Sequence, residues 1–182
     1  MPLTLTNLDV RTRELMLEEL NADIASKHLY FSSRLSAVGL KDFPGLLKEA
    51  VANHDDAWLA AELNTNERLL SIKPRRTVKG GYTIAAVPEN AAEILAESEF
   101  NRYYIRGLCR KAIEQGKGEV EIYRAKSVAT PRAWSERRIG RRIDAAALLR
   151  DLRSHEAPSR FRLPAGANSG LSVKLIGETV AG

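Results

Sequence analysis

Cysteine is nearly absent from this chain, and so are long apolar segments. Cys109 is the single cysteine among 182 residues, so no disulfide can form within the chain, and a lone thiol is typical of a reducing compartment. No apolar run approaches the roughly 20 residues of a membrane-spanning helix. Residues 1–10 lack the basic and apolar regions of a secretory signal peptide. We therefore expect cytoplasmic synthesis, without secretion and without a membrane partner.

Motifs that mark a catalytic or metal site are missing as well. His28, His54 and His155 are the three histidines, and none has the Glu-x-x-His spacing that places two ligands on one helix face. The paired glycines at 80–81 and 116–118 lack the strand–loop–helix order of a phosphate loop. Cys109 lies one residue from Leu108 and three from Ala112, a helix phase compatible with burial. A nucleophile would also need a nearby base, and the sequence places none beside it. We predict no catalytic residue, metal, cofactor or small-molecule substrate, although an enzyme whose site is assembled from distant residues stays a third possibility.

Charge is present in quantity, and it is divided unevenly along the chain. Residues 1–70 carry seven Lys or Arg residues against eleven Asp or Glu residues, a net charge of −4. Residues 71–182 carry 21 against 12, a net charge of +9. A basic half can attract a polyanion, or it can meet the acidic half of a second copy.

Composition and patterning predict an α+β protein in three regions. Hydrophobic residues make up 44% of the chain and charged residues 28%, which is ordinary for a folded domain. We expect a helical hairpin over 1–66, a mixed helix-and-strand module with a basic loop over 67–157, and an extended C-terminal arm over 158–182. The arm either adds a strand to its own sheet or lies along a neighbouring molecule.

The helical hairpin is predicted from apolar residues at spacings of three, four and seven. One helix is expected over residues 9–38, with Gly39 as the residue that ends it. A second is expected over residues 42–63, with Asp42 as its N-cap and Pro44 in its first turn. Two long helices joined by a few residues should pair antiparallel.

The rest of the chain alternates between short strands and helices. Strands are expected over 69–72 and 82–87 on either side of a basic loop, and an edge strand over 120–123. A helix is expected over 88–115, with a break at Ser98. A further helix begins at the N-cap Asp144 and ends before Pro158, and a last strand covers 171–176.

Basic residues gather in two segments that are candidate binding sites. Arginine forks suit phosphate and protein interfaces alike, and an aromatic ring can anchor a partner or stack on a base. A solvated basic loop is the third interpretation. The first segment contains Arg124, Lys126, Arg132, Trp134, Arg137, Arg138, Arg141 and Arg142. The second contains Lys73, Arg75, Arg76 and Lys79.

Without an active-site motif, the sequence favours a structural or assembly role. The hypothesis is a small subunit of a symmetric multi-copy complex, either a homo-oligomer or one that joins other subunits. A virion or head–tail connector component of a tailed bacteriophage is its most concrete form, and it would place the protein in the virion. The alternative is a nucleic-acid-binding protein that uses the arginine-rich segment, although none of the named nucleic-acid-binding motifs is present.

Overall fold

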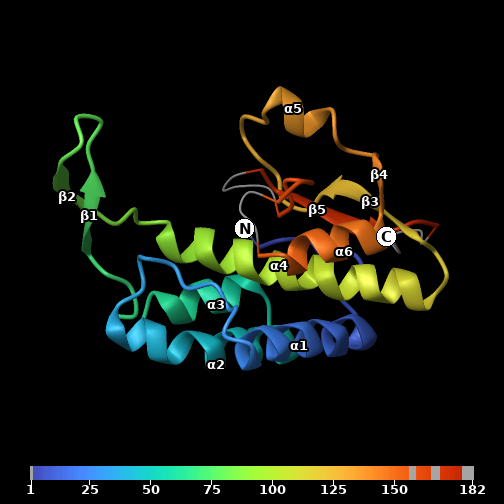
Figure 1. Ribbon diagram of the computed structural model, residues 1–182, viewed down its shortest axis with the longest axis horizontal. Coiled ribbons are helices and arrows are strands. Elements are labelled where there is room, and N and C mark those ends of the chain that lie inside the picture. The colour runs from blue at the N-terminus through green and yellow to red at the C-terminus, as the bar shows by residue number, and fades with distance from the viewer. Residues whose placement is uncertain (1, 156–158, 165–168, 178–182) are drawn as a thin grey trace.

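A computed structural model describes residues 2–155, 159–164 and 169–177 of the chain. Helices and two small antiparallel sheets confirm the predicted α+β class (Figure 1). The elements in chain order are α1 (Val10–Ala25), α2 (Ala37–Asn53), α3 (Asp56–Leu63), β1 (Ile72–Arg76), β2 (Tyr82–Ala86), α4 (Ala91–Glu114), β3 (Glu119–Arg124), α5 (Ala133–Glu136), β4 (Arg142–Asp144), α6 (Ala145–Arg153) and β5 (Leu171–Leu175).

Helix α4 runs through the middle of the molecule, and most other elements pack on it. Helices α1, α3 and α6 and strands β3 and β5 all contact it (Figure 1). A side chain at Gly107 would place its Cβ 2.8 Å from Cγ of Met16 and 3.0 Å from the Thr12 carbonyl oxygen, so the glycine allows α1 to cross α4 closely. The predicted break at Ser98 is wrong, because α4 is continuous through it.

The first helix is shorter than the sequence predicts. Helix α1 ends at Ala25, where the Ser26 hydroxyl donates to the Ala22 carbonyl and Lys27 adopts a left-handed backbone with φ of 61°. The apolar rhythm continues through the following loop because Leu29 and Leu35 are buried there without being helical. A single helix over 9–38 is therefore wrong.

The expected boundary between the two helices is also wrong. Helix α2 begins earlier, after Ser36, whose hydroxyl accepts a hydrogen bond from the Gly39 amide at 3.1 Å. Gly39 lies inside this helix, as does Pro44, and Asp42 accepts a hydrogen bond from Nε of Arg68 at 2.9 Å instead of capping. The stretch up to residue 63 divides at His54, since the Asp55 carboxylate caps α3 by accepting from the Trp58 amide.

The larger sheet has the strand order β4-β3-β5, with both pairs antiparallel. The segment 120–123 is a strand as predicted, but it is the central strand and not an edge. Strand β5 pairs with β3 over its whole length, with Val120 opposite Leu175 and Arg124 opposite Leu171. We expected the C-terminal region either to add a strand to its own sheet or to lie along a neighbouring molecule, and β5 adds a strand to its own sheet. Residues 158, 165–168 and 178–182 of the predicted arm lie outside the described residues.

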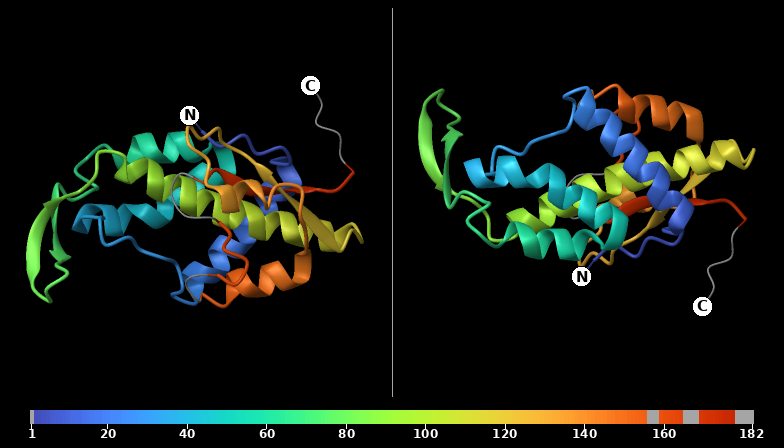
Figure 2. Two further views of the ribbon diagram at one scale, coloured as in Figure 1. Left: turned by 90° about the horizontal axis from the view of Figure 1, so that it is seen from above. Right: turned by 90° about the horizontal axis from the view of Figure 1, so that it is seen from below.

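The smaller sheet is the hairpin of β1 and β2, which stands away from the helices (Figures 1 and 2). Its register pairs Ile72 with Ala86 and Arg76 with Tyr82. Lys73, Arg75 and Arg76 therefore lie in a strand and not in the basic loop expected over 73–81, while Lys79 is in the turn. At the root of the hairpin, Leu35 and Leu69 form a β-bridge, and the Leu70 amide donates to the Arg34 carbonyl at 2.8 Å.

One apolar core is shared by all three regions of the chain. It extends from Met16 in α1 through Phe100 in α4 to Val173 in β5, and each of these side chains is fully buried. Among the described residues, no helix is both long enough and apolar enough to span a bilayer.

Candidate interaction surfaces

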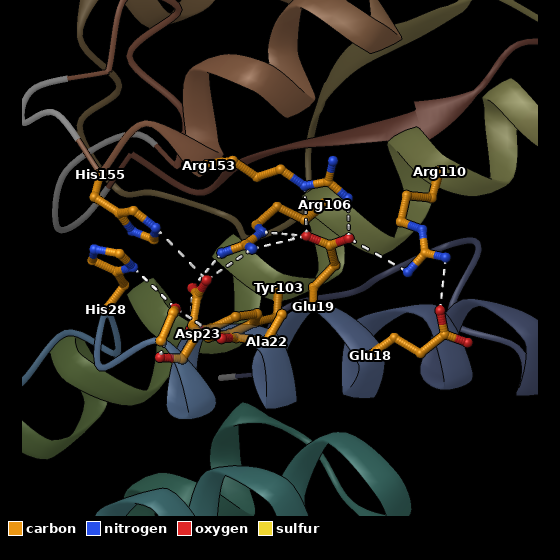
Figure 3. Close-up of polar contacts among 11 residues, drawn as sticks. Glu18, Glu19, Ala22, Asp23, His28, Tyr103, Arg106, Arg110, Arg153 and His155 are labelled. Atoms are coloured by element: carbon orange, nitrogen blue, oxygen red, sulfur yellow. Dashed lines mark hydrogen bonds and ion pairs between the residues drawn. The ribbon is translucent and has the colours of Figure 1, made fainter.

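The uneven charge along the sequence is partly neutralised inside the molecule, in a buried ion cluster between α1, α4 and α6 (Figure 3). Arg106 donates to Glu19 Oε2 from Nε at 3.0 Å and from Nη2 at 2.8 Å, and it also donates to Asp23. Arg153 reaches Glu19 Oε2 at 3.0 Å. Acidic residues of the first 70 thus meet arginines of the rest within a single copy.

The ion cluster is a structural element. Burial by itself would raise the pKa of Glu19, but hydrogen bonds from Arg153 and Arg106 outweigh that effect and hold the pKa below its ordinary value. Burial and the neighbouring Asp23 raise the pKa of Tyr103, whose hydroxyl donates to Asp23 Oδ2 at 3.0 Å. The Glu19 carboxylate accepts four hydrogen bonds from Arg106 and Arg153, so its lone pairs are not available for it to act as a base. The cluster therefore ties three helices together.

Two histidines lie at the edge of the ion cluster. The rings of His28 and His155 stack with centroids 4.6 Å apart, and Nε2 of His155 lies 3.7 Å from Asp23 Oδ1. Burial lowers the pKa of His155 despite the nearby Asp23 carboxylate. Within the described ranges, no group of three or more His, Cys, Asp or Glu side chains is placed to hold a metal ion. Cys109 is buried, and burial raises the pKa of its thiol.

The predicted arginine-rich segment divides into residues that serve the fold and residues that face outward. Arg124 donates to the Ser169 carbonyl at 2.7 Å and pairs with Glu136, and Lys126 pairs with Glu97 at 2.7 Å. These two basic residues therefore anchor loops. Exposed Arg132 precedes α5, and exposed Arg142 lies in β4 opposite Glu121.

The remaining members of that segment line a shallow open groove with a volume of about 450 Å³, which we call the arginine groove. One wall comes from the loop between β3 and β4 and the other from the segment after α6. The lining residues are Trp134, Arg137, Arg138, Arg141, Arg160, Phe161 and Arg162.

Among the described residues, no carboxylate offsets the positive charge of the arginine groove. None of its five arginines forms an ion pair with a described residue, and no acidic residue is among the lining. Arg138 instead donates to the carbonyls of Phe161 and Arg162 and lies 5.5 Å from the centroid of the Trp134 ring. Burial lowers the pKa of Arg138, and the charges of Arg141 and Arg162 lower it further. The groove is therefore a strongly electropositive surface.

The second predicted basic segment forms the hairpin, which has two unlike faces. Side chains alternate between faces along a strand, so the register places Ile72, Pro74 and Arg76 on one face with Tyr82, Ile84 and Ala86. Ile84 is 71% exposed and Tyr82 76% exposed. The opposite face carries Lys73 and Arg75, and Lys73 donates to the Ser33 hydroxyl at 3.3 Å. The apolar face is turned away from the body.

Several residues of these surfaces are missing from the predicted sets. Arg160, Phe161 and Arg162 belong to the predicted arm, and the carboxylate of buried Asp151 places them by accepting from the Arg160 and Phe161 amides at 3.0 and 3.2 Å. The Arg-Phe-Arg triplet is the sequence feature from which these residues could have been predicted. The apolar face of the hairpin becomes visible only once the strand register is known.

Comparison with protein-family models, with curated protein sequences and with solved structures finds no match for this chain. The structure by itself describes the protein as an α+β domain with a projecting amphipathic hairpin and an electropositive groove.

Proposed function

We propose that this protein is a non-catalytic subunit of a multi-copy assembly, in which copies of the chain associate through the hairpin. The observation that carries the proposal is the outward-facing apolar face of β1 and β2. An isolated two-stranded hairpin is marginally stable in water, and exposed apolar side chains on a projecting element mark an interaction surface.

The edges of the hairpin support self-association through β2. Hydrogen-bonded and non-hydrogen-bonded pairs alternate in an antiparallel ladder, and the Val87 amide donates inward to the Ser71 carbonyl at 2.9 Å. Counting from that pair, the backbone groups of Tyr82, Ile84 and Ala86 point outward from β2. On the β1 edge, Pro74 removes one outward donor.

Charge also favours β2 as the contact strand between copies. Residues 82–86 carry no charged side chain, so two copies of β2 can lie antiparallel without placing like charges opposite each other. Lys73, Arg75 and Arg76 are all on β1, one strand further from the contact.

The hairpin alone is small for a stable interface, which needs about 1,000 Å² of buried surface. Further apolar area lies at the same end of the molecule, where α2 begins (Figure 2). Tyr30, Phe31, Val38 and Leu40 are between 42% and 51% exposed there. Val38 and Leu40 lie on different sides of α2, so an interface that includes the hairpin can use part of this area.

Mass measurement by sedimentation, over a range of protein and salt concentrations and after nuclease treatment, tests the proposal. We expect a nuclease-resistant oligomer that salt strengthens, because the basic hairpins repel one another at low ionic strength. Ile84→Asp should dissociate it, whereas Thr83→Asp, which adds the same charge on the opposite face of the same strand, should not. A chain that stays monomeric at high concentration contradicts the proposal, as does equal loss in both variants.

The tailed-phage virion or head–tail connector hypothesis is a narrower form of this proposal and stays a prediction. Its test is the presence of the chain in purified particles.

A further inference from the structure

We infer that the arginine groove binds single-stranded nucleic acid, with guanidinium groups on the phosphates and Trp134 and Phe161 beside the bases. The inference is independent of the hairpin, because the groove is built from the loop around α5 and the segment 160–162.

The first argument is uncompensated charge. Five arginines gather around one groove, and none is paired with a carboxylate in the described residues. In the ion cluster, by contrast, Arg106 is paired with two carboxylates, those of Glu19 and Asp23. Like charges held together without counter-charges repel, so a ligand that brings several negative charges is favoured. A nucleic-acid backbone supplies such charges at regular intervals.

The second argument is preorganisation of the groove. Arg138 is occupied by the carbonyls of Phe161 and Arg162, and it thereby holds the two walls together. Asp151 fixes the backbone of Arg160 and Phe161 from the other side. The exposed side chains of Arg137, Arg141, Arg160 and Arg162 are then free to contact a ligand, at little ordering cost to the backbone that carries them.

The third argument separates a single strand from a duplex. Trp134 and Phe161 are half-buried members of the lining. Their rings can stack on unpaired bases, whose faces a duplex does not offer. The groove is shallow and open, which suits a polymer that passes across it better than a small molecule that must be enclosed.

Tryptophan fluorescence gives a local readout of this groove. Trp58 lies on α3, stacked on His54, so a Trp58→Phe background keeps an aromatic ring there and leaves Trp134 as the only tryptophan. An oligothymidylate about 20 nucleotides long is longer than a short groove can cover. Titration with it should quench Trp134 as bases stack on the ring. Four phosphate contacts would make log K fall with log salt at a slope of about −3.

Two charge-matched variants locate the site. Arg137→Ala with Arg141→Ala removes two charges from the groove and should weaken binding about tenfold or more and reduce the salt slope to about −1.5. Arg75→Ala with Arg76→Ala removes two charges from the hairpin and should leave affinity and quenching unchanged. Arg138 is left intact because its loss would loosen the groove wall.

The outcomes that would overturn the inference are distinct. Equal loss in both double variants would mean nonspecific attraction to a basic protein. Duplex DNA that binds as tightly as the single strand, without quenching Trp134, would mean that the groove holds a backbone and reads no bases. Polyglutamate that displaces the oligonucleotide at equal charge would assign the groove to an acidic protein segment. Absence of binding at about 0.05 M salt would end the proposal outright.

Discussion

The arginines of the ion cluster and those of the arginine groove occupy different environments, and the contrast between them separates fold from function. In the ion cluster, Arg106 is 1% exposed and contacts two carboxylates. In the arginine groove, Arg137, Arg141 and Arg162 are exposed and have no acidic partner among the described residues. Removing an arginine of the first kind leaves buried carboxylates uncompensated, whereas removing one of the second kind relieves repulsion. The first kind therefore maintains the structure and the second is available to a ligand.

Neutralising one arginine of each kind tests this contrast most directly. Arg106→Met leaves Glu19 and Asp23 without their main buried partner and should lower the free energy of unfolding by about 3–5 kcal/mol. Arg137→Met should change it by less than about 0.5 kcal/mol. Urea denaturation of both variants checks this. Equal effects would mean that the groove arginines also support the fold.

A second prediction concerns the junction between body and hairpin. A Cβ at Gly39 would lie 2.1 Å from the Arg68 carbonyl oxygen, next to the root of β1, so Gly39→Ala should destabilise the protein by about 1–3 kcal/mol. Gly45 lies in the same helix, and a Cβ there would meet no atom within 4 Å, so Gly45→Ala should stabilise by up to about 1 kcal/mol. Thermal unfolding distinguishes the opposite signs, and a stabilising Gly39→Ala would contradict the close approach.

The sequence predicts elements whose signals are local. Asp144 is the N-cap expected, accepting from the Ala147 amide at 2.7 Å, and strands form at 120–123 and 171–175 as the alternation indicates. The α+β class follows from such segments. The break after Ala25 is not predictable in the same way, because Leu29 and Leu35 keep a helical spacing while being buried from a loop.

The candidate surfaces are less predictable because they depend on distant contacts. A charge in a sequence carries no indication of its partner, so Arg124 and Lys126 resemble Arg137 in the sequence and differ from it only because the fold places Glu136 and Glu97 beside them. The groove's second wall comes from residues 160–162, which Asp151 positions after a separate helix. The amphipathic character of the hairpin depends on which residues the register pairs.

A third prediction concerns a buried carboxyl within the same core as the ion cluster. Burial raises the pKa of Glu99 to about 6, and Arg102 offsets this only in part. Between the ordinary value of 4.5 and about 6, the folded state keeps a proton that the unfolded state has released, so stability falls as pH rises through this window and is then constant. At pH above 6 the cost is about 2 kcal/mol.

Glu99→Gln removes that titration. Relative to the native chain, the variant should gain about 2 kcal/mol of unfolding free energy on going from pH 4 to pH 7.5. Denaturant titrations at the two values measure the difference, and Glu93→Gln on the exposed side of α4 is the matched control. A gain that is the same at both pH values would show that folding does not shift the pKa of Glu99.

The smallest effect on stability is expected from the largest change in the chain, which is removal of the hairpin. Ser71 and Val87 already face each other, with the Val87 amide donating to the Ser71 carbonyl, so a short Gly-rich turn can replace residues 72–86. The core contains none of the residues removed, and the body should unfold within about 0.5 kcal/mol of the native chain. Self-association should be lost, while oligothymidylate binding at the arginine groove should persist. A shortened chain that still assembles would move the contact to another surface, and one that unfolds would show that the hairpin belongs to the body after all.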